Sequence, residues 1–296
     1  MSQTPTMYGW AVACFSAALL AFSSPALAFP PPLPEEETHF VKLMAALKAD
    51  QDIGLVTIAA AAKFLGRPYV AGSLNVTNDP ELRETLVCRF DAFDCVTLVE
   101  TSLAMARART RSDSGWKRFR SELETLRYRG GQREGYASRL HYFTEWIRDN
   151  DARGIVKDLT PALGGEPVSR PLNFMSRHRK AYGQLLNDEV WAQVRETERV
   201  VSRRPRSVIP KNRLPAVVPM LQSGDILAFA TGVEGLDVAH VGLAIRKDDG
   251  VVYLLHAPEK GQPVQISKKP LLQYILGIAG HTGLMIARPQ AVDTSL

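Results

Sequence analysis

The apolar and polar positions divide the chain into a helical first part and a strand-rich last part. Apolar residues recur at helical spacing in three segments, 40–47, 53–65 and 96–106. The second helix is expected to stop at Gly66, because a glycine followed closely by a proline is a helix stop signal. The third is expected to begin next to Asp94, since aspartate is a good N-cap residue.

Short apolar runs separated by turns follow in the last part of the chain. They predict five strands, at residues 224–229, 238–245, 251–256, 264–266 and 283–287. The middle of the chain, about 110–215, is aromatic and basic, and we expect irregular structure and short helices there. Helices first and an antiparallel sheet later predict the α+β class.

The N-terminal segment has the features of an export signal. Residues 1–28 contain no Lys, Arg, Asp or Glu, and an apolar run from Trp10 to Phe22 precedes the small residues Ala26 and Ala28. This pattern predicts a signal peptide that is removed after Ala28, and therefore a periplasmic or exported protein. The alternative is a membrane anchor, although the run is shorter than the roughly 20 residues that span a bilayer.

A polar leader is expected after the signal, because residues 29–38 combine four prolines with three consecutive glutamates. Residues 39–296 are expected to form a single domain. No later segment is long and apolar enough to span a bilayer, so the mature chain is expected to lack a transmembrane span.

The net charge of +5 is unevenly distributed along the chain. The stretch 195–213 holds seven basic and two acidic residues, and such a stretch attracts anions. Behind a signal peptide, an anionic wall polymer or membrane surface suits this stretch better than nucleic acid, which is not expected as a partner. A solvated face on a basic protein is an equally good explanation.

The chain has three cysteines, of which Cys14 would leave with the signal. Cys88 and Cys95 then remain, and an exported protein with two cysteines invites a disulfide. The alternative is a pair of free thiols, because a nucleophilic thiol must stay reduced to act. We favour free thiols, with Cys88 buried and structural.

Cys95 is the first candidate for chemistry. It stands at the expected start of the third helix, where unpaired N–H groups and a partial positive charge favour a thiolate. The same N–H groups can stabilise an oxyanion. A lone cysteine at a helix start is, however, more often a small buried hydrophobe.

Two histidines strengthen the case. His240 follows Cys95 at a separation comparable to the ~130–150 residues of papain-like enzymes. His256 ends the next expected strand. A hairpin loop with an odd number of residues centred on Asp248 would place His240 directly opposite His256, on one face, whereas an even loop would separate them. In the first register His256 can orient His240 as the third member of a triad.

A metal site is the competing use of these residues. Structural zinc is usually held by close ligand pairs such as Cys-x2-Cys, and none occurs here. We therefore expect no metal and no other cofactor.

Together the motifs resemble those of NlpC-type cysteine peptidases, and within them the AmiA-like N-acetylmuramoyl-L-alanine amidase family. The resemblance rests on the segments Phe64–Gly72, Phe93–Thr97, Arg127–Gly131, Ser138–Ile147, Asn173–Ser176, Gly224–Leu227, His240–Gly242 and His256–Ala257. It implies a papain-like fold, with N-terminal helices packed on a C-terminal antiparallel sheet. The region at about 110–215 would then be a substrate-recognition insertion in the catalytic domain.

The resemblance also implies an activity, hydrolysis of the amide between muramic acid and L-alanine in peptidoglycan fragments. Cys95 would be the nucleophile, His240 the general base and His256 the orienting residue. Tyr69 would line the pocket or help the oxyanion. Further substrate contacts are expected from Asp94, Arg139, His141, Tyr142 and Trp146.

Three alternatives remain open at this point. A related peptidase would cut the stem peptide between D-glutamate and diaminopimelate. A non-catalytic cell-wall-binding protein would keep the fold without the reaction, and a metal hydrolase would need a bound ion. Whether the substrate is a soluble anhydro-muropeptide or the intact wall is also open, because the stretch 195–213 matches no motif of the family.

Overall fold

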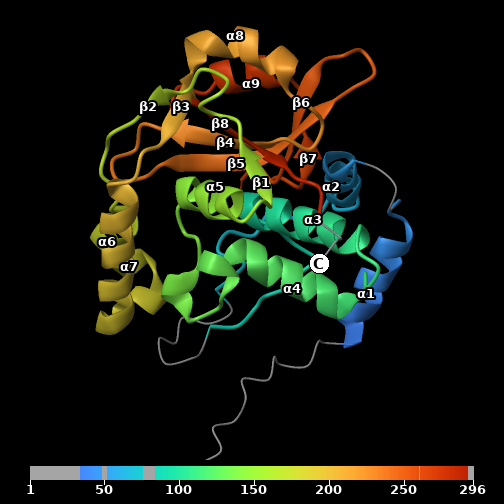
Figure 1. Ribbon diagram of the computed structural model, residues 1–296, viewed down its shortest axis with the longest axis horizontal. Helices are drawn as coiled ribbons and strands as arrows, with labels where there is room; N and C mark the ends of the chain where they lie inside the picture. Colours follow the sequence, from blue (N-terminus) through green and yellow to red (C-terminus); the bar gives the residue numbers. More distant parts are fainter. Residues whose placement is uncertain (1–33, 49–51, 76–83, 260, 293–296) are drawn as a thin grey trace, which may run out of the picture. The chain divides into compact units, whose positions relative to one another are not determined.

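The computed structural model describes residues 34–48, 52–75, 84–259 and 261–292 (Figure 1). The first part of the chain is helical, as the spacing predicts. Its helices are α1 (Pro34–Ala45), α2 (Ile53–Ala62) and α3 (Cys95–Arg109). The predicted signal peptide lies outside the described residues.

The boundary of the predicted leader is wrong at its C-terminal end. Helix α1 begins at Pro34, inside the segment 29–38 that was expected to be a polar leader. A proline is well tolerated in the first turn of a helix. The three glutamates in that turn stabilise the helix, because their negative charges lie at the positive end of the helix dipole. The helix is then held by Phe40 and Met44, which are buried in the core.

The middle of the chain is more regular than predicted. Its helices are α4 (Trp116–Arg127), α5 (Phe143–Ala152), α6 (Phe174–Arg177) and α7 (Asp188–Ser202). Helix α7 has 15 residues, as many as α3. Asn187 caps it, and Val194 and Val201 are buried on one face. The many charged residues on its other faces conceal this narrow apolar stripe in the sequence.

An antiparallel sheet forms the last part, as predicted, and the α+β class is confirmed. The strands run in the order β2-β3-β8-β4-β5-β6-β7, and β1 pairs with β8. Their bounds are β1 (Val156–Asp158), β2 (Glu166–Pro167), β3 (Ser207–Pro210), β4 (Ile226–Thr231), β5 (Val238–Arg246), β6 (Val252–His256), β7 (Gln265–Ile266) and β8 (His281–Pro289). The last five match the predicted strands. The first three were not predicted, because they lie in the middle segment, where irregular structure and short helices were expected.

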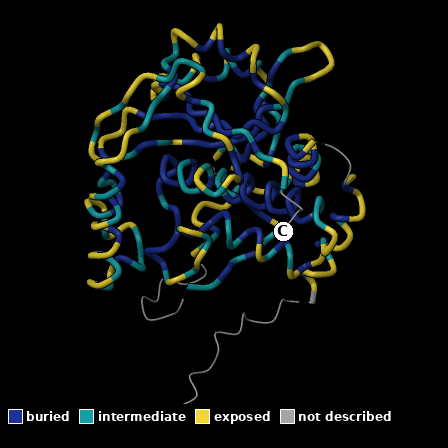
Figure 2. The backbone as a smooth tube through the Cα atoms, in the orientation of Figure 1, coloured by how far each residue is buried: buried dark blue, intermediate teal, exposed yellow. Residues whose placement is uncertain are grey.

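Both faces of the sheet are covered by helices (Figure 1). Alternate residues of β4 show this: Ile226 and Ala228 belong to the core shared with the N-terminal helices, whereas Leu227 and Phe229 belong to a second core. The second core is closed by α8 (Leu214–Val217) and α9 (Leu271–Leu276). The central strands are therefore buried on both sides (Figure 2).

A close backbone contact fixes α2 against the start of β4. Gly224 has a φ of 93°, and a Cβ added to it would lie 2.3 Å from the Cα of Gly54. The next residue, Asp225, is buried and accepts two hydrogen bonds from Arg288 on β8, at 2.7 and 2.8 Å. The residue types of the motif Gly224–Leu227 are thus explained by these structural contacts.

No helix in the described part of the chain is long and apolar enough to cross a membrane.

Candidate active site

Helix α3 begins at Cys95, and a reciprocal capping box fixes that start. The Asp94 carboxylate accepts a hydrogen bond from the backbone N–H of Thr97 at 2.8 Å, and the Thr97 hydroxyl accepts one from the N–H of Asp94 at 2.9 Å. Ser73 donates a further bond to Asp94 at 3.2 Å. Asp94 lines the cavity described below, but its carboxylate is committed to positioning Cys95.

The surroundings of the Cys95 thiol hold it in the neutral form. Burial raises its pKa to about 12, and the Asp94 carboxylate acts in the same direction. Backbone N–H groups of Val241, Val96 and Cys95 itself lower this pKa, but they do not outweigh burial. The helix N-terminus therefore lowers the pKa of the Cys95 thiol, as expected. Burial outweighs this effect, so the thiol and not the thiolate is the resting state.

His240 and His256 form a hydrogen-bonded pair. The Nε2 atom of His240 lies 2.8 Å from the Nδ1 atom of His256. The two rings are close to perpendicular, with an interplanar angle of 74°. Both residues are more than nine-tenths buried.

Of the two loop alternatives, the hairpin has the odd one, so both histidines share a face, but the loop is not centred on Asp248. Leu243 pairs with Leu255 and Arg246 with Val252, so the turn is centred on Asp249 rather than Asp248. His256 consequently lies beside Gly242, and its contact with His240 is diagonal. Gly242 makes room for this contact, because a Cβ at that position would lie 3.0 Å from the Cβ of His256.

Both histidines are neutral at ordinary pH. Burial lowers the pKa of His240 to about 3, and repulsion from His256 and His281 adds to the effect. Burial lowers the pKa of His256 to about 4. His240 can accept a proton at Nδ1 only if its Nε2–H donates to His256, so His256 must offer an unprotonated Nδ1.

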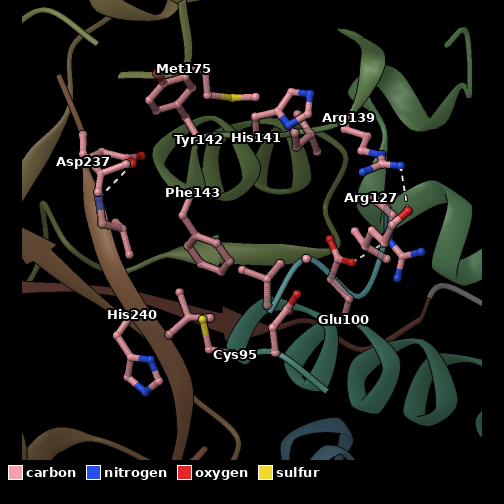
Figure 3. Close-up of a pocket in the computed structure, with 18 of the residues that line it drawn as sticks. Cys95, Glu100, Arg127, Arg139, His141, Tyr142, Phe143, Met175, Asp237 and His240 are labelled. Atoms are coloured by element: carbon pink, nitrogen blue, oxygen red, sulfur yellow. Dashed lines mark hydrogen bonds and ion pairs between the residues drawn. The ribbon is translucent and has the colours of Figure 1, made fainter. Parts of the chain in front are cut away.

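Cys95 and His240 line one cavity of about 280 Å³. Figure 3 shows them near one another at one end, with Tyr142, His141 and Met175 at the other. No hydrogen bond joins the Cys95 thiol to the His240 ring in the described residues, and bonds of this kind often tighten only when substrate is bound. The arrangement brings together a thiol, a neutral imidazole and helix N–H groups.

Three of the predicted substrate contacts also line this cavity: Arg139, His141 and Tyr142. Arg139 donates to both carboxylate oxygens of Glu84, at 2.5 and 2.8 Å, and its guanidinium lies over the ring of Tyr136. The Tyr142 hydroxyl donates to Glu198 at 2.7 Å. Their hydrogen bonds fix the part of the cavity wall that the middle segment supplies.

The other two predicted contacts lie elsewhere. Trp146 is fully buried, stacks on Phe143 and donates from Nε1 to Glu100 at 3.2 Å, so it belongs to the core and not to the cavity wall. The expectation of a substrate contact at Trp146 is wrong. Tyr69 is half-buried and does not line the cavity, although it forms an isolated β-bridge with Phe93, two residues before Cys95. Burial raises the pKa of Tyr69, and the charges of Cys95 and Asp94 act in the same direction.

Some residues of the cavity wall were missed from the sequence. Phe143, Asp237 and the ion pair of Glu100 with Arg127 all line the cavity. Arg127 donates to Glu100 at 2.7 Å, and both side chains are 3% exposed. Helical spacing from Cys95 does not point to Glu100, because five residues along α3 turn a side chain by about 140° away from the starting face. Nothing local in the sequence pairs it with Arg127.

The remaining cysteine and the basic stretch have simpler surroundings. Cys88 is a buried free cysteine, and burial raises its pKa to about 11. In the stretch 195–213, Arg199 pairs with Glu196 and Arg213 with Glu166.

Within the described ranges, no group of three or more His, Cys, Asp or Glu residues is arranged to hold a metal ion.

Comparisons with known proteins show which family and fold the chain resembles. A crystal structure of an N-acetylmuramoyl-L-alanine amidase from Bacteroides uniformis is similar, with a TM-score of 0.74 and 34% identity over 80% of this chain and 99% of that one. A crystal structure of a proposed xylanase from Bacteroides fragilis is also similar. It has a TM-score of 0.71 and 35% identity over 77% of this chain and 98% of that one. Protein LPG0564 from Legionella pneumophila has the same fold, with a TM-score of 0.63 and 20% identity over 87% and 94%.

No curated protein matches the chain. The model of the AmiA-like family, described as N-acetylmuramoyl-L-alanine amidase-like, matches residues 59–282, which is most of the chain and contains Cys95, His240 and His256. The chain therefore belongs to the AmiA-like family.

Proposed function

We propose that the protein is a cysteine-dependent N-acetylmuramoyl-L-alanine amidase of the papain-like, NlpC-type kind. The observation that carries this proposal is the placement of Cys95 at the start of α3, in one cavity with a His240 that is bonded to His256. This set provides a nucleophile, a base and an orienting group. The match to the family and the similarity to the amidase from Bacteroides uniformis support hydrolysis of an amide bond.

The reaction follows from the protonation states. His240 takes the thiol proton at Nδ1 as the Cys95 sulfur attacks the lactyl carbonyl carbon of the muramic acid. The resulting oxyanion lies within reach of N–H groups in the first turn of α3. His240 then gives its proton to the amine of L-alanine as the C–N bond breaks, which leaves a thioester. A water molecule, deprotonated by His240, attacks the thioester, and the proton returns to the sulfur.

The neutral resting pair makes His240 a general base in the attack step. A preformed thiolate–imidazolium pair would require a low thiol pKa and a high imidazole pKa, and burial acts against both. Proton transfer during the attack avoids separated charges in the resting site. His256 stabilises the imidazolium by accepting the hydrogen bond from Nε2.

The cavity wall supports a sugar on the acyl side of the thiol. Tyr136, Tyr142 and Phe143 line it together with Arg139 and His141. Aromatic faces and fixed polar groups are the usual elements of a small-molecule pocket. This wall comes from the middle segment, which favours the sugar–peptide amide over the D-glutamyl–diaminopimelate bond of the alternative peptidase.

A glycosidase is a poorer explanation, although the Bacteroides fragilis protein is described as a proposed xylanase. Most glycosidases use two available carboxylates across the bond. The carboxylates of this cavity are engaged: Asp94 caps α3, Glu100 pairs with Arg127, and Asp237 accepts from the N–H and hydroxyl of Thr144.

A defined anhydro-muropeptide tests the proposal. Wild-type protein should release the disaccharide and the intact stem peptide, as mass spectrometry would show, and Cys95→Ala should release neither. A dipeptide product would support the endopeptidase instead. Full activity in Cys95→Ala would exclude cysteine catalysis, and Cys88→Ala is the matched control that should keep activity.

The cellular setting forms part of the same proposal. We place the enzyme in the periplasm on the basis of residues 1–28, and its partners are peptidoglycan fragments. Removal of these residues should retain the protein in the cytoplasm, which fractionation of the source cells would show. The stretch 195–213 would add attraction to anionic wall polymer through arginines that remain exposed, such as Arg203 and Arg204.

A further inference from the structure

A second cavity of about 590 Å³ adjoins the catalytic histidines. It is built from the ends of β5 and β6, from β7, α9 and the start of β8. His240 lines both this cavity and the first one, whereas Cys95 lines only the first. The residues that line the second cavity are mainly polar, and they include His256, Gln262, Gln265, Ser267, Tyr274 and His281.

His281, which lines this cavity, carries an unsatisfied polar atom. The residue is 7% exposed, and its Nδ1 atom is buried without a hydrogen-bond partner in the described part of the chain. The ring packs on Phe229, with 5.0 Å between centroids. A buried polar atom without a partner is costly, and a ligand that offers a hydrogen bond removes that cost.

Charged groups of both signs surround the same cavity. Lys268 and Lys269 are exposed at its edge, and Glu259 is exposed nearby. The lysine segment is held in place by Ser267, whose hydroxyl donates to the carbonyl of Lys269 at 2.7 Å and accepts from the N–H of Leu254 at 3.1 Å. The backbone that carries the two lysines is therefore fixed relative to β6.

The direction of the substrate follows from the reaction. The acyl carbon must reach the Cys95 sulfur, which lies in the first cavity. The leaving nitrogen must lie next to His240, which protonates it. The chain that continues beyond this nitrogen therefore extends past His240, where the second cavity begins.

We propose that the second cavity binds the leaving peptide, and that it selects an acidic peptide through Lys268, Lys269 and His281. This inference rests on the proposed amidase function. The peptide that leaves carries a new ammonium group at the cut end, and Glu259 can bind it. The carboxylates of D-glutamate and diaminopimelate then face the two lysines, while His281 donates from Nδ1 to a peptide oxygen.

Binding of the product peptide tests the inference without turnover. The probe is synthetic L-alanyl-γ-D-glutamyl-diaminopimelate, titrated calorimetrically into the Cys95→Ala protein. Lys268→Ala/Lys269→Ala should weaken binding about tenfold, because each exposed charge pair contributes modestly. The control Lys117→Ala/Lys247→Ala removes two exposed lysines outside the cavity and should leave the affinity unchanged.

Three further readouts make the outcome decisive. Amidation of the peptide's carboxylates should weaken binding as much as the double lysine variant does. The peptide should shift the imidazole NMR signal that His281→Asn removes. Peptide binding that survives both the lysine and the His281 changes overturns the inference. A protein that binds the peptide but never cleaves the muropeptide instead refutes the proposed function and leaves the peptide site intact.

Discussion

The Nε2 atom of His240 and the Nδ1 atom of His256 are 2.8 Å apart, and this single contact sets the direction of proton transfer at the site. A base-competent His240 must donate through Nε2, so its partner has to accept. The second imidazole does so only in the tautomer that carries its proton on Nε2. The pair therefore works as one unit, in which His256 acts through His240.

The first prediction concerns this accepting atom. His256→Ala should lower kcat about 100-fold, since the base loses its orientation and its correct tautomer. His256→Asn offers a side-chain oxygen that can accept from Nε2–H and should recover part of the loss. Steady-state kinetics on an anhydro-muropeptide measures both. Equal activity of the two variants would show that hydrogen-bond acceptance is not the role of His256.

The second prediction concerns thiol reactivity. Because burial raises the pKa of Cys95 to about 12, alkylation by iodoacetamide should be slow at pH 7 and should accelerate only well above pH 9. The rate is followed by mass spectrometry in a Cys88→Ala background, which leaves Cys95 as the one cysteine in the described part of the chain. Rapid alkylation at pH 7, with a midpoint below 8.5, would show that Cys95 rests as a thiolate instead.

The sequence predicts the parts of this site that depend on local pattern. Asp94 and Cys95 could be placed at a helix start because capping is local, and the strands carrying His240 and His256 could be placed because their apolar runs are long. The register between those strands was missed by one residue, since turn geometry decides it.

Contacts between distant segments could not be predicted in the same way. Trp146 was expected to contact substrate because of its position in the middle segment, and only the tertiary structure shows it in the core beside Glu100. His281 belongs to none of the motifs identified in the sequence. Its position depends on the pairing of β8 with β4, which no local pattern contains.

The third prediction is loss of stability in mild acid. Burial lowers the pKa of His141 and His240 to about 3 and that of His256 to about 4, below the ordinary value of 6.5. Between about pH 3 and pH 6.5, the unfolded chain therefore binds more protons than the folded chain. Stability is fully present above pH 6.5 and is lost as pH falls towards 3, at up to about 1.4 kcal/mol per pH unit for each histidine.

Urea unfolding at pH 7 and pH 5 measures this effect. His141→Gln removes one titrating group, and its free energy of unfolding should fall less between the two pH values than that of the wild type. The exposed His178 provides the control, and His178→Gln should follow the wild-type pH dependence. A stability that is constant over this range would contradict the buried, neutral state of the histidines.

The fourth prediction concerns the ion pair beneath the cavity, in which Arg127 donates to Glu100 at 2.7 Å. Removal of one partner leaves the other charge buried, so Glu100→Gln or Arg127→Met should each lower the free energy of unfolding by about 3–5 kcal/mol. Glu100→Gln/Arg127→Met should cost less than the sum of the two single variants, because no uncompensated charge remains.

An exposed pair provides the comparison for this cycle. Glu196→Gln breaks the bond with Arg199 on α7. Both side chains of this pair are about half exposed, so the change should affect stability far less than either variant of the buried pair. Chemical unfolding gives the free energies, and kcat and KM of the folded fraction show whether the pair also contacts substrate. A purely supporting pair leaves KM unchanged in the double variant. A raised KM, with the fold intact, would instead place Glu100 and Arg127 in direct contact with the sugar, because both line the cavity that holds Cys95.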